Sequence, residues 1–156
     1  MFLKAWVKSF TEFDANLETV WLAPDCLYLS LKKAGMLVVV QSPRDSYLYL
    51  RHDYALPEGC VQIWNHLSGS KLSEIDIMPS DRIVTMKLSQ RNIYHELKEY
   101  QLICELMPPK PNVIICKLNG PNLIVQDALL KYTLSENPMR MVLSNQPYYP
   151  PQTTIS

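Results

Sequence analysis

The chain has 156 residues, 47% of them hydrophobic, and its 15 Lys and Arg residues balance its 15 Asp and Glu residues. This length allows one domain with a real core and excludes two full domains. A general nucleic-acid binder is usually basic. Because the formal net charge here is zero, any contact with RNA or DNA has to come from a local patch.

The first part of the chain predicts one helix followed by an antiparallel sheet. Apolar residues recur at helical spacing between Phe2 and Phe13, which predicts an amphipathic helix over residues 2–14. Strands are predicted at 17–22, 27–31, 36–41 and around Leu48 and Leu50. Residues 32–35 form the expected hairpin turn between the second and third of these strands. Strands that follow one another through short turns indicate antiparallel pairing.

The second part predicts another helix and more strands. Pro57 suits the first position of a helix and Gly69 its end, so a helix is predicted between them. Strands are predicted at 72–77, 82–88, 101–107, 113–118 and 122–126, with a polar helical turn or long loop over 90–100. The hairpin pairs 101–107 with 113–118, and Asn119-Gly120 turns the chain into the last strand. The predicted class is α+β, an antiparallel sheet system flanked by few helices.

Three further features bear on location and boundaries. Lys4 and Lys8 interrupt the N-terminal stretch, which therefore lacks the apolar core of a signal peptide. The longest apolar run, residues 36–40, is far shorter than a membrane span. The cysteines contain no CxxC pair, so we expect them to be reduced, buried thiols of a cytosolic protein without a zinc site. These are Cys26, Cys60, Cys104 and Cys116.

Two apolar runs each carry an ionised residue that folding does not require. Arg82 heads a face of its strand that is otherwise apolar, while Asp81 points the other way at the strand entrance. Glu105 shares a face with Ile103 and Met107. A carboxylate in such surroundings needs a cationic partner, and Arg82 is the obvious candidate. A structural ion pair that locks the two strands is the commoner role of such pairs, and a ligand-facing role is the alternative.

Other motifs point to no enzyme chemistry. The sequence has no GxGxxG, Walker A, GxSxG or HExxH motif. The three histidines, at 52, 66 and 95, lack metal-ligand spacing, and no nucleophile has an evident base. We expect no catalytic residue, no metal and no cofactor. The tyrosines at 47, 49, 148 and 149 are able to stack on bases, but aromatic residues in strands more often pack on a sheet face.

Two runs carry a family resemblance. Residues 81–84 read Asp-Arg-Ile-Val, and residues 105–107 read Glu-Leu-Met and are followed by Asn-Val-Ile-Ile at 112–115. They closely resemble the NFACT N-terminal domain, which was first labelled fibronectin-binding protein A and is shared by the RqcH–NEMF family of ribosome quality-control factors. Further matching features follow in the same order along nearly the whole chain. They are residues 66–69, 71–72, 140–143 and 147–151.

The resemblance implies a fold similar to the N-terminal domain of formamidopyrimidine-DNA glycosylases. It also implies that the domain binds tRNA on an obstructed large ribosomal subunit, so that the stalled chain is extended without a template. In that family the Asp-Arg pair and the Glu-Ile/Leu-Met strand are needed to engage tRNA. Carried over residue by residue, the tRNA-binding residues are Asp81, Arg82, Glu105, Leu106 and Met107. The accessory candidates are Lys110, Asn112 and Arg140.

This chain departs from the family pattern at several cations. Family members often carry Gly-Arg-x-Ser-Asn after the Glu-x-Met, whereas residues 108–112 read Pro-Pro-Lys-Pro-Asn. Trp64-Asn65 replaces an Arg-Lys pair, and Tyr47 stands where an arginine is usual. Each change removes a charge that would neutralise phosphate, so we expect weak RNA binding by this domain alone or dependence on other domains. The chain starts Met-Phe-Leu and lacks the N-terminal Pro-Glu of the glycosylases.

We therefore expect a non-enzymatic, cytoplasmic, RNA-binding domain whose partners are tRNA and the large ribosomal subunit, without membrane contact. Residues 1–146 are the expected domain and residues 147–156 a Pro-rich linker, with downstream domains of the full-length protein missing. The alternative is a protein-interaction or adhesin module with no RNA role, as the older family name suggests. The absence of a secretion signal argues against this alternative. A nucleic-acid-cleaving enzyme lacks a nucleophile and a base.

Overall fold

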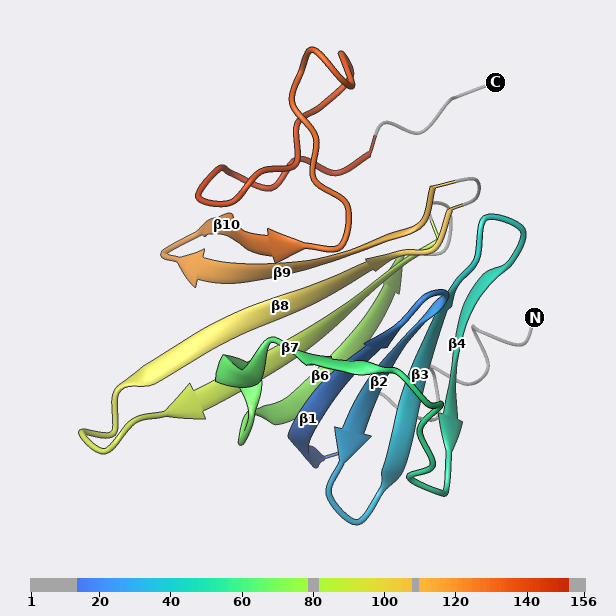
Figure 1. Cartoon of the computed structure of the whole chain (residues 1–156). Helices are drawn as coiled ribbons and strands as arrows, with labels where there is room; N and C mark the ends of the chain where they lie inside the picture. Colours follow the sequence, from blue (N-terminus) through green and yellow to red (C-terminus); the bar gives the residue numbers. More distant parts are fainter. Residues whose placement is uncertain (1–13, 79–81, 108–109, 152–156) are drawn as a thin grey trace.

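The computed structural model describes residues 14–78, 82–107 and 110–151. Within these ranges the chain forms one ten-stranded sheet with antiparallel pairing, and its one helical element, η1, is a 3-10 turn at Asn65–Leu67 (Figure 1). The strands are β1 (Ala15–Ala23), β2 (Cys26–Leu31), β3 (Gly35–Gln41), β4 (Ser46–Arg51), β5 (Val61–Ile63), β6 (Lys71–Met78), β7 (Ile83–Arg91), β8 (Leu97–Glu105), β9 (Asn112–Asn119) and β10 (Asn122–Ala128). Their order in the sheet is β10-β9-β8-β7-β6-β1-β2-β3-β4, and β5 pairs with β1.

The predicted α+β class is wrong, because the regular secondary structure of the described residues is almost entirely antiparallel β-strand. The helix expected between Pro57 and Gly69 does not form. Val61–Ile63 instead adds to β1 as β5, which suits two β-branched residues in three. Trp64 then adopts a left-handed φ of 50° and ends that strand before the short η1 turn. The helix expected over residues 2–14 falls almost wholly on residues 1–13, outside the described residues.

Residues 90–100, predicted as a helical turn or long loop, contain no helix, and the non-strand part is shorter than predicted. β7 continues to Arg91, and β8 begins at Leu97. Asn92 accounts for the difference, because its Oδ1 accepts hydrogen bonds from the backbone N–H groups of Tyr94 and Glu96 at 2.9 and 3.0 Å. Such side-chain bonds favour a turn over a helix. The polar residues between 92 and 96 therefore form a hairpin turn.

The strands and turns predicted from the sequence are confirmed within a few residues, except that β5 was not predicted and β8 covers 97–105 in place of the predicted 101–107. Leu31 pairs with Gly35 across the first predicted turn. Gln101 pairs with Cys116 in the predicted hairpin of β8 and β9. These elements were readable because alternating apolar residues and short glycine turns are local signals.

The sheet folds over on itself at β1, which gives two packed halves (Figure 1). Ala15 and Asn16 pair with β6, whereas β1 pairs with β2 from Leu17 onward, across a bulge between Leu17 and Thr19, and with β5 at residues 20–22. The main core lies between the half formed by β1–β4 and the half formed by β6–β9. A second core lies on the outer face of β7–β10. There the C-terminal segment, residues 129–151, packs against the sheet through Tyr132, Val142 and Tyr148. We call this second core the outer core.

Candidate functional site

Arg82 lies immediately before β7, at a corner where the two halves of the sheet meet. Its φ of 51° is left-handed, and its side chain is exposed. Its carbonyl oxygen accepts a hydrogen bond from the Leu106 N–H at 3.0 Å, so Arg82 lies beside the Glu-Leu-Met run. Its Nη2 donates to the carbonyl oxygen of Ser46, the first residue of β4, at 2.7 Å. The main chain of both halves therefore positions this arginine.

Glu105 is buried, with 1% of its surface exposed, and its partner is Arg140. Nη1 of Arg140 donates to Oε2 of the carboxylate at 2.8 Å, and Nη2 donates to Oε1. The Tyr148 hydroxyl donates to the same Oε2 at 2.7 Å. This bidentate pair joins the end of β8 to the C-terminal segment.

The protonation states of this cluster suit a structural lock. Burial lowers the pKa of Arg140, but the hydrogen bonds and charge of Glu105 outweigh it and raise that pKa above its ordinary value. Burial and then the Glu105 carboxylate raise the pKa of Tyr148 above its ordinary value. Arg140 is therefore charged and Tyr148 neutral at physiological pH, which keeps both as donors.

The predicted ion pair between Arg82 and Glu105 is wrong because the two side chains belong to opposite faces of the sheet. The register places Ile83 opposite Glu105, so these two share a face with the outer core. Val84 is buried in the main core on the other face, which is the face that Arg82 would continue. The resemblance gave Arg140 as an accessory candidate, but no local pattern paired it with Glu105, because the two lie 35 residues apart in the sequence.

The rest of the Glu-Leu-Met run is mostly interior. Leu106 is fully buried in the main core, and Met107 is half-buried against the outer core. Met107 and Glu105 line a cavity of about 760 Å³ beside the C-terminal segment. Most of the Glu-Leu-Met run therefore lies inside the protein and supports the neighbouring surface from within.

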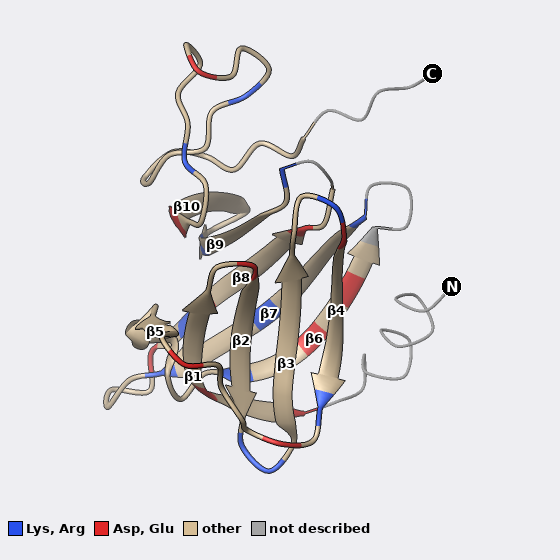
Figure 2. Ribbon diagram, turned by 45° about the vertical axis from the view of Figure 1, so that its right-hand side comes forward, with Lys and Arg blue, Asp and Glu red and all other residues tan. Residues whose placement is uncertain are grey.

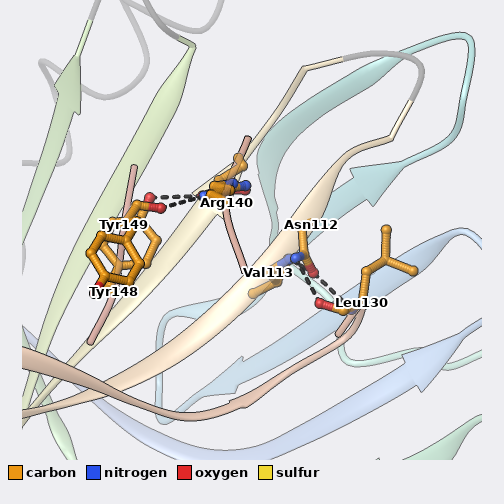
Figure 3. A network of polar contacts seen from close by, with 7 residues as sticks. Asn112, Val113, Leu130, Arg140, Tyr148 and Tyr149 are labelled. Carbon is orange, nitrogen blue, oxygen red and sulfur yellow. Dashed lines mark hydrogen bonds and ion pairs between the residues drawn. The ribbon is translucent and has the colours of Figure 1, made fainter. Parts of the chain in front are cut away.

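The remaining predicted residues divide between interior and surface. Asn112 is buried and holds the backbone of Leu130, whose N–H donates to Oδ1 at 2.9 Å and whose carbonyl accepts from Nδ2 at 3.0 Å (Figure 3). Lys110 is exposed. Asp81 lies outside the described residues. Among the described site residues, Arg82 and Lys110 are thus the exposed ones.

Exposed cations gather at one end of the sheet. Blue segments mark the loops from β3 to β4, β6 to β7 and β8 to β9 at that end (Figure 2). Arg44, Arg82 and Lys110 are exposed on these loops. Lys110 also lines a cavity of about 560 Å³ together with Pro43, so the first and last of these loops are neighbours. Exposed Asp45 adds an opposite charge, which keeps the patch only modestly positive.

One aromatic residue belongs to the same surface. Tyr47 follows the serine that binds Arg82, is 39% exposed and packs against Tyr49 with ring centroids 6.0 Å apart. We call Arg44, Tyr47, Arg82 and Lys110 the rim cluster. The sequence predicts Tyr47 as a stacking candidate but does not predict Arg44. The loop of Arg44 lies near Arg82 because Arg82 binds Ser46, a contact that depends on sheet topology and not on spacing in the chain.

Trp64, which stands where the family has a cation, has a structural contact. Its indole N–H donates to Oδ2 of Asp127 at 2.8 Å and ties the start of η1 to β10. Burial raises the pKa of Asp127, but hydrogen bonds from Trp64 and Lys131 outweigh this and hold that pKa below its ordinary value. Trp64 therefore contributes a tertiary contact between η1 and β10.

The described residues contain no group of three or more His, Cys, Asp and Glu side chains arranged for a metal ion. In the same part of the chain, no helix has the length and hydropathy needed to cross a bilayer. Burial, followed by the charge of Glu105, raises the pKa of the Cys104 thiol to about 12, so this thiol is protonated and a poor nucleophile. Cys26 and Cys60 are half-buried, so the expectation of four buried thiols is wrong.

Solved structures share this fold at low sequence identity. The N-terminal domain of fibronectin-binding protein PavA from Streptococcus pneumoniae superposes with a TM-score of 0.81 and 17% identity, over 99% of this chain and 62% of that one. The N-terminal part of the fibronectin/fibrinogen-binding protein FBPS from Streptococcus suis gives 0.78 and 19%, over 99% and 62%. The fibrinogen-binding protein from Staphylococcus aureus gives 0.74 and 16%, over 98% and 56%. The chain thus spans 56–62% of these structures.

Sequence comparison assigns the family. No curated protein matches the chain at a significant level. The family described as "NFACT N-terminal and middle domains" matches residues 27–156, which is most of the chain and includes β2 from its second residue, the strands β3–β10 and the C-terminal segment. The chain belongs to the NFACT N-terminal domain family.

Proposed function

We propose that this NFACT N-terminal domain is a non-enzymatic RNA-binding domain of a ribosome quality-control factor. It binds tRNA on obstructed large ribosomal subunits and supports untemplated extension of stalled chains. The observation that carries the proposal is the placement of Arg82, an exposed arginine held by main-chain contacts at a cation-bearing end of the sheet. Its position matches the family arginine that the resemblance ties to tRNA engagement.

The chemistry of the rim cluster suits an RNA backbone. A guanidinium has five N–H donors in a planar fork, so Arg82 is able to contact the Ser46 carbonyl and a phosphate at once. Arg44 and Lys110 add flexible positive charges on neighbouring loops. The ring of Tyr47 offers a face on which an unpaired base is able to stack.

Glu105 supports this surface from inside. Its pairing with Arg140 and Tyr148 fixes the C-terminal segment on the outer face of the sheet, and the next residue in the chain donates its N–H to Arg82. The need for a glutamate at this position in the family is then explained by its role in positioning the neighbouring surface. Direct contact between Glu105 and RNA is not required.

Arg82→Ala tests the proposal. We expect this variant to bind tRNA about 10- to 100-fold more weakly in fluorescence anisotropy, since hydrogen bonds to a charged group contribute about 1.5–3 kcal/mol. Arg82→Lys should recover part of the loss because the charge remains without the fork. Lys32→Ala, in the exposed turn between β2 and β3 at the other end of the sheet, is the matched control.

Two results contradict the proposal. The first is a wild-type domain that binds neither tRNA nor large subunits carrying peptidyl-tRNA in co-sedimentation. The second is an Arg82→Ala variant that stays folded by urea denaturation and still binds tRNA as the wild type does.

A protein-binding role is the second candidate, and the names of the structural relatives favour it. Two of them are described as fibronectin-binding or fibronectin/fibrinogen-binding proteins, and one as a fibrinogen-binding protein. Binding of the wild-type domain to immobilised fibronectin or fibrinogen, without binding to tRNA, would support this role instead.

A further inference from the structure

The hairpin formed by β7 and β8 projects beyond the rest of the sheet (Figure 1). β6 stops pairing with β7 at the pair Lys71–Ser89, and β9 stops pairing with β8 at the pair Lys117–Tyr100. Beyond these points the two strands pair only with each other, ending at Arg91–Leu97. At about 3.3 Å per residue, the turn stands about 10 Å outside the neighbouring strands.

The base of this projecting arm is braced against η1. The side-chain amide of Gln90 donates to the carbonyl oxygens of His66 at 2.7 Å and Ser68 at 3.3 Å. The His66 ring also meets the Tyr100 ring edge-on, with centroids 5.8 Å apart. These contacts hold the arm at a defined angle to the sheet.

The turn itself is held by polar contacts. Oδ1 of Asn92 accepts two backbone N–H groups, and Nδ2 of Asn92 donates to Oε2 of Glu96 at 3.0 Å. Nη1 of Arg91 donates to the carbonyl oxygen of His95 at 2.9 Å, and His95 adopts a left-handed φ of 61°. The conformation of the turn is therefore set before any partner binds.

This ordered turn presents apolar side chains to solvent. Ile93 is 86% exposed and Tyr94 is 75% exposed, the two highest values among the exposed large hydrophobic residues described, and Leu97 beside them is 49% exposed. Ile and Tyr side chains on a rigid turn are costly to hydrate and lose little entropy on binding. Such residues are typical anchors of protein interfaces.

The charges of the arm distinguish a protein partner from RNA. Arg91 and Lys98 are balanced by Glu96 and Glu99, so the arm has no net charge with which to displace counterions from a phosphate backbone. Arg91 and Glu96 are also engaged within the turn. Apolar tip residues within a ring of both charge signs match the core and rim of a protein–protein interface.

We propose that the tip of this arm, Ile93 and Tyr94, anchors the domain by entering an apolar pocket on a partner protein. This inference rests on the proposed function, under which the partner is a protein of the large ribosomal subunit. The tip and the rim cluster lie at opposite ends of β7, whose nine residues span about 30 Å. The domain would thus hold RNA at one end and protein at the other.

A photo-crosslinking amino acid in place of Tyr94 tests the anchor with purified large subunits carrying peptidyl-tRNA. We expect a covalent adduct with a ribosomal protein. Tyr94→Ser and Ile93→Ser should each weaken co-sedimentation at least tenfold while leaving the binding of free tRNA unchanged. Asn92→Ala should weaken co-sedimentation to a smaller extent, because it loosens the turn but keeps both apolar side chains. Leu134→Ser, at a residue 54% exposed on the C-terminal segment, is the matched control and should have no effect.

The outcomes separate this proposal from the proposed function. An adduct with RNA, a crosslinked pair of domains, or no adduct despite co-sedimentation overturns the anchor and leaves tRNA binding standing. If wild-type protein fails to sediment with the subunits, the anchor is overturned, and free-tRNA binding by wild type and Arg82→Ala then decides the RNA role separately. Equal sedimentation of the Tyr94→Ser and Leu134→Ser variants also overturns the anchor.

Discussion

Glu105 shows how a single charged residue helps to hold a segment that has little regular secondary structure. The C-terminal segment contains no strand of its own among the described residues, and isolated bridges at Ile124–Pro147 and Tyr132–Val142 are its regular pairing. Backbone hydrogen bonds between β10 and residues 145–148 hold one part of it, and side chains add the remaining attachment. The carboxylate receives both terminal nitrogens of Arg140 and the hydroxyl of Tyr148, so it satisfies most of its acceptor capacity within the protein.

Glu105→Gln should lower the free energy of unfolding by about 3–5 kcal/mol, because it leaves the buried Arg140 charge without compensation. Urea denaturation measures this loss. The double variant Glu105→Leu/Arg140→Met should recover most of it, since both charges are removed together. Glu74→Gln breaks an exposed pair with Lys87 and should leave the denaturation midpoint close to that of the wild type. A double variant as unstable as Glu105→Gln would show that the ion pair is not the cause.

Hairpin turns are the elements that join neighbouring strands of this fold, and their glycines differ in what surrounds them. Gly35 begins β3 with a φ of +106°, and a Cβ there would overlap the Arg51 carbonyl oxygen of β4. Gly120, in the turn between β9 and β10, has a φ of +63° and open space at the same position. The first glycine is required by packing and by backbone conformation, the second by conformation alone.

Gly35→Ala should therefore destabilise the domain by about 2–5 kcal/mol, from backbone strain plus overpacking. Gly120→Ala, the matched control, should cost about 1–2 kcal/mol from strain alone. Thermal denaturation of both variants checks the difference. Equal losses would mean that the neighbouring strand moves aside at Gly35.

The same elements show how far the sequence could predict this fold. Alternation around Leu29, Leu48 and Val84 identified strands because each apolar residue faces the main core. The helix predictions were wrong where tertiary pairing outweighed local signals. In the predicted helix between Pro57 and Gly69, residues 61–63 form β5 because they pair with β1. The arrangement of the candidate site was unpredictable for a related reason. Motifs named Arg82, Lys110 and Arg140, whereas the pairing of Arg140 with Glu105 and the place of Arg44 depend on contacts distant in sequence.

The formal net charge of the whole molecule is zero, but its charged residues are distributed unevenly. The rim cluster collects cations at one end of the sheet, while the projecting arm at the other end is neutral. Long-range attraction to RNA is then weak, and the patch has to act at short range. The affinity of the isolated domain for RNA should therefore reflect few phosphate contacts.

The salt dependence of tRNA binding tests this distribution of charge. Each phosphate contact contributes about −0.7 to −0.9 to the slope of log K against log salt concentration, so the three rim cations predict a slope of about −2 to −3. Arg44→Ala should make the slope shallower by one contact, whereas Lys32→Ala at the far end should leave it unchanged. Anisotropy titrations between about 50 and 200 mM salt measure both. A slope far steeper than −3, or one that Lys32→Ala and Arg44→Ala change equally, would place RNA over a broader surface than the rim cluster.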